Sequence, residues 1–180
     1  MTGLAIAETI DTDLDAVLAI HRRAFDGDAE AALVRDLIAD PTALPRLSLL
    51  ARDGDAPVGH VLFTAVRIEG SDLPVDAAIL CPLAVVPEAQ GRGGGGALVD
   101  AGLRRLADAG TALVFVLGDP AFYGRFGFIA APPHGLAAPY DLPAAYAGAW
   151  QVCALHDDLP SFGGRIVCAD ALMQPHYWTA

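Results

Sequence analysis

The chain contains no lysine, so all 11 of its basic side chains are arginines, set against 22 acidic residues. A Walker-type phosphate loop needs Gly-Lys followed by Ser or Thr, and the lack of lysine excludes it. The formal net charge of −11 does not favour a polyanionic partner, so we expect no binding to nucleic acid. The acidic surface either suits a cationic partner such as a protonated amine or only keeps the protein soluble.

Long hydrophobic runs are also missing. The longest uncharged apolar run, residues 77–86, is far shorter than the roughly 20 residues of a membrane-spanning helix, and the N-terminus has no basic region typical of a secretory signal. The 3 cysteines show no zinc-site spacing, so we expect no metal, and their odd number favours reduced thiols in the cytoplasm. Cys153 and Cys168 could nevertheless face each other across a hairpin.

What the chain does have is a glycine-rich turn. Residues 80–97 read L-C-P-L-A-V-V-P-E-A-Q-G-R-G-G-G-G-A, an apolar strand followed by the start of an amphipathic helix. Without Cβ atoms the backbone can approach a bulky ligand, and the unpaired N–H groups and dipole of a helix N-terminus favour a negative charge. The segment therefore predicts a pyrophosphate site. Its expected residues are Gln90, Gly91, Arg92, Gly93, Gly94, Gly95 and Gly96. Arg92, Arg104, Arg105 and Arg125 lie near it in sequence and could offset the acidic remainder of the chain.

The hydrophobic pattern around the turn predicts one domain over residues 1–180, of mixed α/β class. Residues 79–117 read as a right-handed strand–helix–strand unit of parallel strands, and the preceding strands as antiparallel. The expected strands cover 4–8, 47–52, 58–68, 77–86 and 112–117, followed by a closing hairpin of 152–155 with 165–169, and the expected helices cover 13–25, 29–38 and 93–109. Residues 130–150 read as a long loop that could cover an acceptor pocket.

Two stretches together resemble the GCN5-related N-acetyltransferase (GNAT) family. Residues 90–95, Q-G-R-G-G-G, fit its acyl-CoA segment Q/R-x-x-G-x-G/A, and residues 117–128, L-G-D-P-A-F-Y-G-R-F-G-F, are similar to one bacterial subgroup of predicted acetyltransferases. The resemblance implies a sheet with two splayed strands, acetyl-CoA as cosubstrate, a primary amine as acceptor and often a homodimer. It also implies that a backbone N–H of Leu83, Ala84 or Val85 holds the thioester oxygen and that Tyr123 protonates the departing thiolate.

A dinucleotide site is the rival interpretation. Gly91, Gly93 and Gly96 also satisfy G-x-G-x-x-G, and Asp119 follows at roughly the spacing of a ribose-binding acid. Against this, residues 87–90 separate the strand from the first glycine, which should follow it almost at once. Asp119 could equally cap a short helix that begins at Pro120.

The chemistry of acyl transfer needs a base, an oxyanion donor and an acid. Pro82 supports an irregular strand at the expected oxyanion donor, because proline marks a bulge or an edge. Tyr123 is the expected acid, although it could instead only pack beside the neighbouring phenylalanines. Arg125 could bind a phosphate or pair with surface acids.

The base is unassigned. Many relatives carry a glutamate where this chain has Ile79, Leu80 and Cys81. The remaining candidates are Asp119, His60, Glu69, Asp76, His134 and Asp141, or a chain of water molecules. The missing carboxylate keeps open a catalytically silent acyl-CoA-binding regulator, beside the less favoured NAD(P)-dependent oxidoreductase. The acceptor could be a protein N-terminus, a lysine, a polyamine, an aminoglycoside or a small metabolite.

Overall fold

The centre of the molecule is a mixed sheet, and the computed structural model describes residues 3–71 and 75–179. Its main path runs in the order β1-β2-β3-β4-β5-β8-β6, with β9 paired to β3 and to β7. Neighbours are antiparallel except the parallel pairs β4–β5 and β7–β9. The strands are β1 (Ala5–Glu8), β2 (Leu47–Asp53), β3 (Ala56–Ile68), β4 (Ala77–Val85), β5 (Leu113–Leu117), β6 (Ile129–Ala130), β7 (Leu136–Ala137), β8 (Trp150–Ala154) and β9 (Gly164–Val167).

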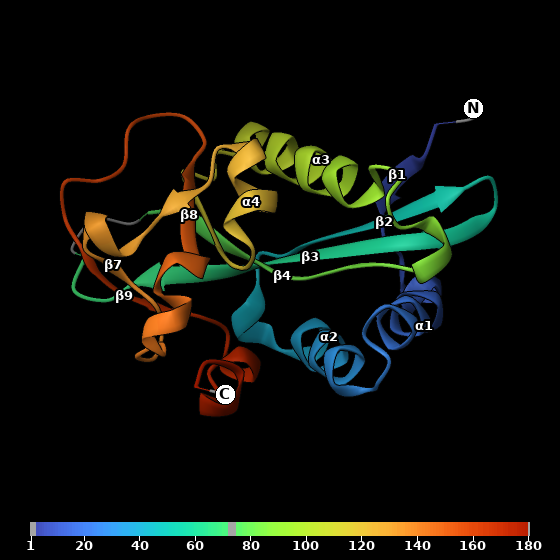
Figure 1. Cartoon of the computed structure of the whole chain (residues 1–180), viewed down its shortest axis with the longest axis horizontal. Coiled ribbons are helices and arrows are strands. Elements are labelled where there is room, and N and C mark those ends of the chain that lie inside the picture. Colours follow the sequence, from blue (N-terminus) through green and yellow to red (C-terminus); the bar gives the residue numbers. More distant parts are fainter. Residues whose placement is uncertain (1–2, 72–74, 180) are drawn as a thin grey trace.

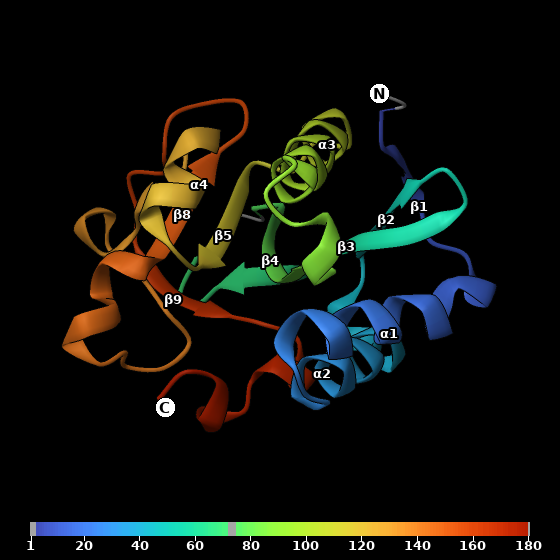
Figure 2. The same ribbon diagram turned by 45° about the vertical axis from the view of Figure 1, so that its right-hand side comes forward.

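Helices cover both faces of the sheet. Helices α1 (Leu14–Phe25) and α2 (Ala29–Ala39) lie on one face, and α3 (Gly94–Asp108) and the short α4 (Pro120–Tyr123) lie on the other (Figures 1 and 2). Each long helix buries an apolar stripe, as the expected periodicity requires. On α3 the outer side carries the ion pair of Asp100 with Arg104, and Gly110 follows its end with φ +91°. The C-terminal segment lies beside α2 in both views.

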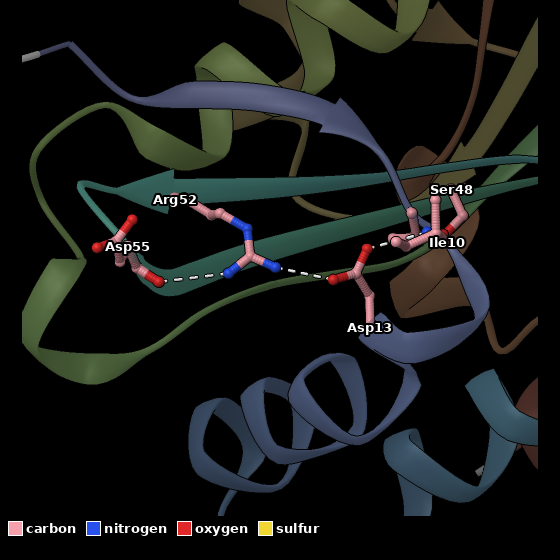
Figure 3. Close-up of polar contacts among 6 residues, drawn as sticks. Ile10, Asp13, Ser48, Arg52 and Asp55 are labelled. Atoms are coloured by element: carbon pink, nitrogen blue, oxygen red, sulfur yellow. Dashed lines mark hydrogen bonds and ion pairs between the residues drawn. The ribbon is translucent and has the colours of Figure 1, made fainter.

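A small polar cluster fixes the start of α1 to the sheet (Figure 3). One carboxylate oxygen of Asp13 accepts the backbone N–H of Ile10 at 2.9 Å, and the other accepts the Arg52 guanidinium at 2.8 Å. Arg52 also donates to the backbone carbonyl of Asp55 at 3.3 Å, in the turn after β2.

Strands β4 and β5 splay apart, as the family resemblance implied. They pair only from Ala77 opposite Leu113 to Ile79 opposite Phe115, although β4 continues to Val85. The register between β3 and β4 shifts beside Pro82, which confirms the expected irregularity. The α/β prediction with a central strand–helix–strand unit is thereby confirmed.

The expected closing hairpin is wrong. Strand β8 pairs with β5 and β6, whereas β9 pairs with β3 and β7. The physical reason is backbone hydrogen bonding: β8 is buried over nearly its whole length, and a buried strand needs partners for the N–H and C=O groups at both of its edges. Cys153 and Cys168 therefore do not face each other, and both are free thiols. Among the described residues, no helix is both long and apolar enough to span a membrane.

Candidate active site

The glycine-rich turn closes the end of β4 onto the start of α3. The side-chain amide of Gln90 donates to the Val85 carbonyl at 2.8 Å and so holds the turn against the strand. Gly91 and Gly93 have φ values of +74° and +81°, a left-handed conformation that L-residues with a Cβ rarely adopt. Helix α3 begins at Gly94, directly after this turn.

A cavity of about 450 Å³ lies at this turn and is called the glycine cavity below. It is lined by Leu83, Val85, Ala89, Gln90, Gly91, Gly93, Gly94, Gly95, Gly96, Phe122 and Arg125. The first N–H groups of a helix have no acceptor inside it, so those of α3 are available to an anion here. A Cβ built on Gly95 would lie 3.6 Å from the Phe122 ring, an ordinary contact. Larger side chains at this position would therefore occupy the cavity and not the protein core.

Of the arginines near the turn in sequence, Arg125 lines the glycine cavity. Its guanidinium lies over the Phe122 ring, 4.8 Å from the centroid, and its Nε donates to the Phe122 carbonyl at 3.2 Å. No ion pair to Arg125 is formed within residues 3–71 and 75–179, so its charge is free for a ligand.

The other arginines do not line the glycine cavity. Arg92 lines a neighbouring cavity of about 340 Å³, which shares Val85, Ala89 and Gly94 with the glycine cavity. Arg104 pairs with Asp100, and Arg105 lies 3.8 Å from the Glu8 carboxylate. For Arg104 and Arg105, proximity in sequence does not bring the side chain to the turn, because a helix carries residues ten positions apart roughly 15 Å along its axis.

The register of β4 reduces the expected oxyanion donors from three residues to two. The N–H of Val86 donates to the Val58 carbonyl at 2.9 Å, and Ala84 lies opposite His60. Because bonded and non-bonded pairs alternate along an antiparallel ladder, the N–H of Ala84 points at β3 and is not available at the splay. The N–H groups of Leu83 and Val85 point away from β3, toward the side on which β4 is no longer paired with β5.

Tyr123 ends α4 and is buried, with its ring packed edge-on against Phe122 and Phe128 at centroid distances of 4.8 and 5.6 Å. Burial, and to a smaller extent the neighbouring Cys81, raises the pKa of its phenol well above the usual range. The phenol therefore stays protonated, and its hydroxyl has no hydrogen-bond partner in the described part of the chain. A free donor on a buried ring can serve as an acid as well as a packing group.

Asp119 is a helix cap. Its carboxylate accepts the N–H of Ala121 at 2.9 Å, at the start of α4. The interpretation of Asp119 as a cap is thus confirmed, and the arrangement offers no support for a ribose ligand or a dinucleotide site.

A second cavity of about 520 Å³, called the acceptor cavity below, lies beside the splayed strands. Leu83 lines both cavities, and Tyr123 lines the acceptor cavity, so the two meet at the expected reaction centre. Its walls come from four separate segments: Phe25 to Leu33, Ile79 to Leu83, Val116 to Tyr123, and Leu172 to Trp178. Glu30 and His176 are in these walls, and sequence reasoning missed both, because only the packing of α2 and the C-terminal segment beside β4 brings them there.

The base candidates named from the sequence lie elsewhere or are occupied. Burial and the charge of Glu30 raise the pKa of the Cys81 thiol to about 12, which rules it out as a base near neutral pH. His60 is buried in a hydrogen bond to His21 at 2.8 Å, and Asp141 pairs with Arg165 at 3.0 Å. Glu69, Asp76 and His134 do not line the acceptor cavity. Residues 142–149 of the long loop border an adjoining cavity of about 500 Å³ that shares Leu117, Tyr177 and Trp178 with it.

Comparisons with known proteins agree with this geometry. A family model described as an acetyltransferase (GNAT) domain matches residues 5–131. The N-acetyltransferase YjhQ of Escherichia coli is 41% identical over 164 residues, covering 90% of each chain. The crystal structure of YhbS from Escherichia coli in complex with CoA is similar with a TM-score of 0.84 and 36% identity, covering 95% of this chain and 92% of that one. A Brucella melitensis acetyltransferase in complex with acetyl-CoA gives a TM-score of 0.74 at 28% identity, covering 96% and 99%.

Proposed function

The chain belongs to the GNAT acetyltransferase family, and we propose that it transfers the acetyl group of acetyl-CoA to a primary amine by direct attack in a ternary complex. As a member of this family it is an acyl-CoA-dependent N-acetyltransferase. The observation that carries the proposal is that the glycine cavity and the acceptor cavity share Leu83, and that Tyr123 lines the acceptor cavity. Donor and acceptor can therefore approach the same point from two sides.

In this proposal each group at the junction has a role. The first turn of α3 and Arg125 hold the pyrophosphate, with Gln90 keeping the turn in place. The N–H of Leu83 or Val85 stabilises the negative charge that develops on the thioester oxygen. The amine attacks the carbonyl carbon, the C–S bond breaks, and the hydroxyl of Tyr123 protonates the departing thiolate. A covalent acyl-enzyme is not part of the scheme, because the Cys81 thiol is held protonated by burial.

A thermal melt tests the cofactor first. Acetyl-CoA, CoA, NAD and NADP are added separately to the purified chain, and a ligand at a hundred times its Kd stabilises the fold by about 2.7 kcal/mol. For a domain of this size we expect acetyl-CoA and CoA to raise Tm by several degrees and the nicotinamide cofactors to leave it unchanged. A shift with NAD or NADP alone would return Asp119 to the role of ribose ligand.

Turnover separates an enzyme from a silent acyl-CoA-binding regulator. Release of CoA that depends on an added amine excludes the regulator. We further propose that the chain forms one domain over residues 1–180, supported by the single sheet that joins its described strands. A cytoplasmic location and the pairing of two copies through a sheet edge both stay predictions, the second for sedimentation analysis.

A further inference from the structure

The acceptor cavity is almost entirely apolar and aromatic. Leucine, isoleucine and valine side chains of β4, β5 and α2 form one part of its wall, and Phe25, Tyr123, Tyr177 and Trp178 form much of the rest. Its volume of about 520 Å³ falls in the ordinary range for small-molecule sites. Such a wall stabilises an apolar body and gives no partner to additional charges, which would lose their hydration on entry.

Among the residues that the structure describes, Glu30 is the one carboxylate in the wall of this cavity, and no arginine lines it. It lies in the first turn of α2 and is half-buried. Within the described residues its carboxylate has neither a hydrogen bond nor an ion pair. Cys81 and Tyr177 line the same cavity, and the charge of Glu30 adds to burial in raising the pKa values of both side chains. A carboxylate held without a cation beside an apolar cavity is suited to a cationic ligand.

We propose that the acceptor is a small primary amine with one positive charge and an apolar or aromatic body, and that Glu30 binds its ammonium group and takes the first proton. This inference rests on the proposed function and names the substrate class of that same site. It also supplies the base that β4 lacks at Ile79 to Cys81. Polyamines and aminoglycosides are excluded, because their further ammonium groups would meet the apolar wall unpaired.

The protons balance in this scheme. Glu30 takes one proton from the ammonium group, and the freed electron pair of the nitrogen forms the N–C bond as the C–S bond breaks. The thiolate takes the proton of Tyr123, and the second proton that leaves the nitrogen restores the phenol. Glu30, which is half-buried, then releases its proton to solvent. One ammonium ion and one acetyl-CoA give one amide, one CoA and one proton.

The test measures kcat/KM for a panel of amines with the full chain and acetyl-CoA, following the released CoA thiol. The panel is phenethylamine, hexylamine, spermidine and kanamycin. We expect the two monoamines to exceed spermidine and kanamycin by at least about 100-fold, because each desolvated, unpaired charge costs several kcal/mol. Equal or faster turnover of spermidine or kanamycin, or no turnover of either monoamine, would overturn the inference.

The variant Glu30→Gln tests the role of the carboxylate. We expect kcat/KM for phenethylamine to fall about 100-fold, the contribution of a positioned base, with an unchanged Kd for acetyl-CoA in calorimetry. The deficit should shrink as the pH rises toward the pKa of the amine, since free amine then needs no base. The matched control is Asp15→Asn, which removes the same charge from an exposed position on α1 and should change nothing.

These measurements separate the two proposals. If acetyl-CoA does not bind the wild-type chain, the proposed function fails and this inference fails with it. If acetyl-CoA binds and monoamines are acetylated, but Glu30→Gln retains wild-type kcat/KM at every pH, the proposed function stands and the role of Glu30 is refuted.

Discussion

The glycine cavity and the acceptor cavity lie side by side along β4, but they are built in different ways. The first is formed mainly by the backbone of one continuous segment, residues 83–96, with Phe122 and Arg125 closing it. The second is formed by side chains from four segments that are distant in the sequence. Backbone groups recognise a feature that all acyl-CoA donors share, whereas side chains can change one by one. We infer that the first cavity fixes the chemistry and the second fixes the acceptor.

The sharpest way to break this comparison is to fill the backbone-built cavity. Gly95→Val places a side chain beside Phe122 without backbone strain, because residue 95 is helical and a Cβ fits there. We expect acetyl-CoA to bind more than about 100-fold more weakly, while the Tm of the free protein stays nearly unchanged. A clash of the added side chain with the bound ligand costs about 1–3 kcal/mol of binding free energy, and the contacts of the ligand to the N–H groups are lost as well. Calorimetry and a thermal melt measure the two effects.

Gly93→Ala is its counterpart. The added methyl group would meet no other atom within 4 Å, so it causes no clash. Residue 93 has a φ of +81°, however, and a side chain in this conformation lowers the stability of the fold by about 1–2 kcal/mol. We expect this variant to lower Tm and to keep more of the affinity for acetyl-CoA than Gly95→Val does. Wild-type affinity in Gly95→Val would mean that the ligand does not occupy the glycine cavity.

Tyr123 stands where the two cavities approach each other and should therefore affect turnover more than binding of either substrate. Tyr123→Phe removes the hydroxyl and keeps the packing against Phe122 and Phe128. We expect kcat to fall about 100-fold with unchanged affinity for acetyl-CoA, because only protonation of the thiolate is lost. Tyr146→Phe, at an exposed tyrosine of the long loop, is the control. An unchanged kcat would assign Tyr123 to packing alone.

The same contrast explains what the sequence revealed and what it did not. The turn at Gln90 to Gly96 and the cap at Asp119 are local features, and both were recognised from neighbouring residues. Glu30 carries no such signal, because its place beside Cys81 and His176 depends on three segments packing together. The expected hairpin of residues 152–155 and 165–169 failed for the same reason, since its strands pair with distant partners.

A buried pair of histidines joins α1 to β3, and it makes the stability of the fold depend on pH. His21 of α1 and His60 of β3 share a hydrogen bond of 2.8 Å, and His60 bonds Ser48 at 2.8 Å. Burial lowers the pKa of His21 to about 4, while burial and the nearby His21 lower that of His60 to about 3. Both side chains are therefore neutral in the folded protein at pH 5.

The unfolded chain takes up protons at these histidines below a pKa of about 6.5, whereas the folded chain does not. The contribution of these histidines to the free energy of unfolding is therefore fully present above pH 6.5. It is lost as the pH falls from 6.5 toward the folded-state pKa values of about 4 and 3. From pH 7 to pH 5 we expect a loss of about 2 kcal/mol per buried histidine. Urea unfolding at pH 7 and pH 5 measures this loss. In His21→Gln the fall in the free energy of unfolding between the two pH values should be about 2 kcal/mol smaller than in the wild-type protein. The exposed His134→Gln is the control, and an equal loss in both variants would contradict the assignment.

Arg125 offers the test with the smallest expected effect. Among the described residues it is the charged side chain that lines the glycine cavity. Its guanidinium is held over Phe122 and has a free charge, so it can pair with a phosphate of the donor. We expect Arg125→Gln to weaken acetyl-CoA binding about tenfold, or by about 1.4 kcal/mol, close to the lower end of the range for one hydrogen bond to a charged group, and to leave Tm unchanged. Arg92→Gln, whose side chain lines a different cavity, should have a smaller effect on the Kd. If instead Arg92→Gln produced the larger loss, the pyrophosphate would lie on the other side of the turn, and the junction at Leu83 would no longer connect donor and acceptor.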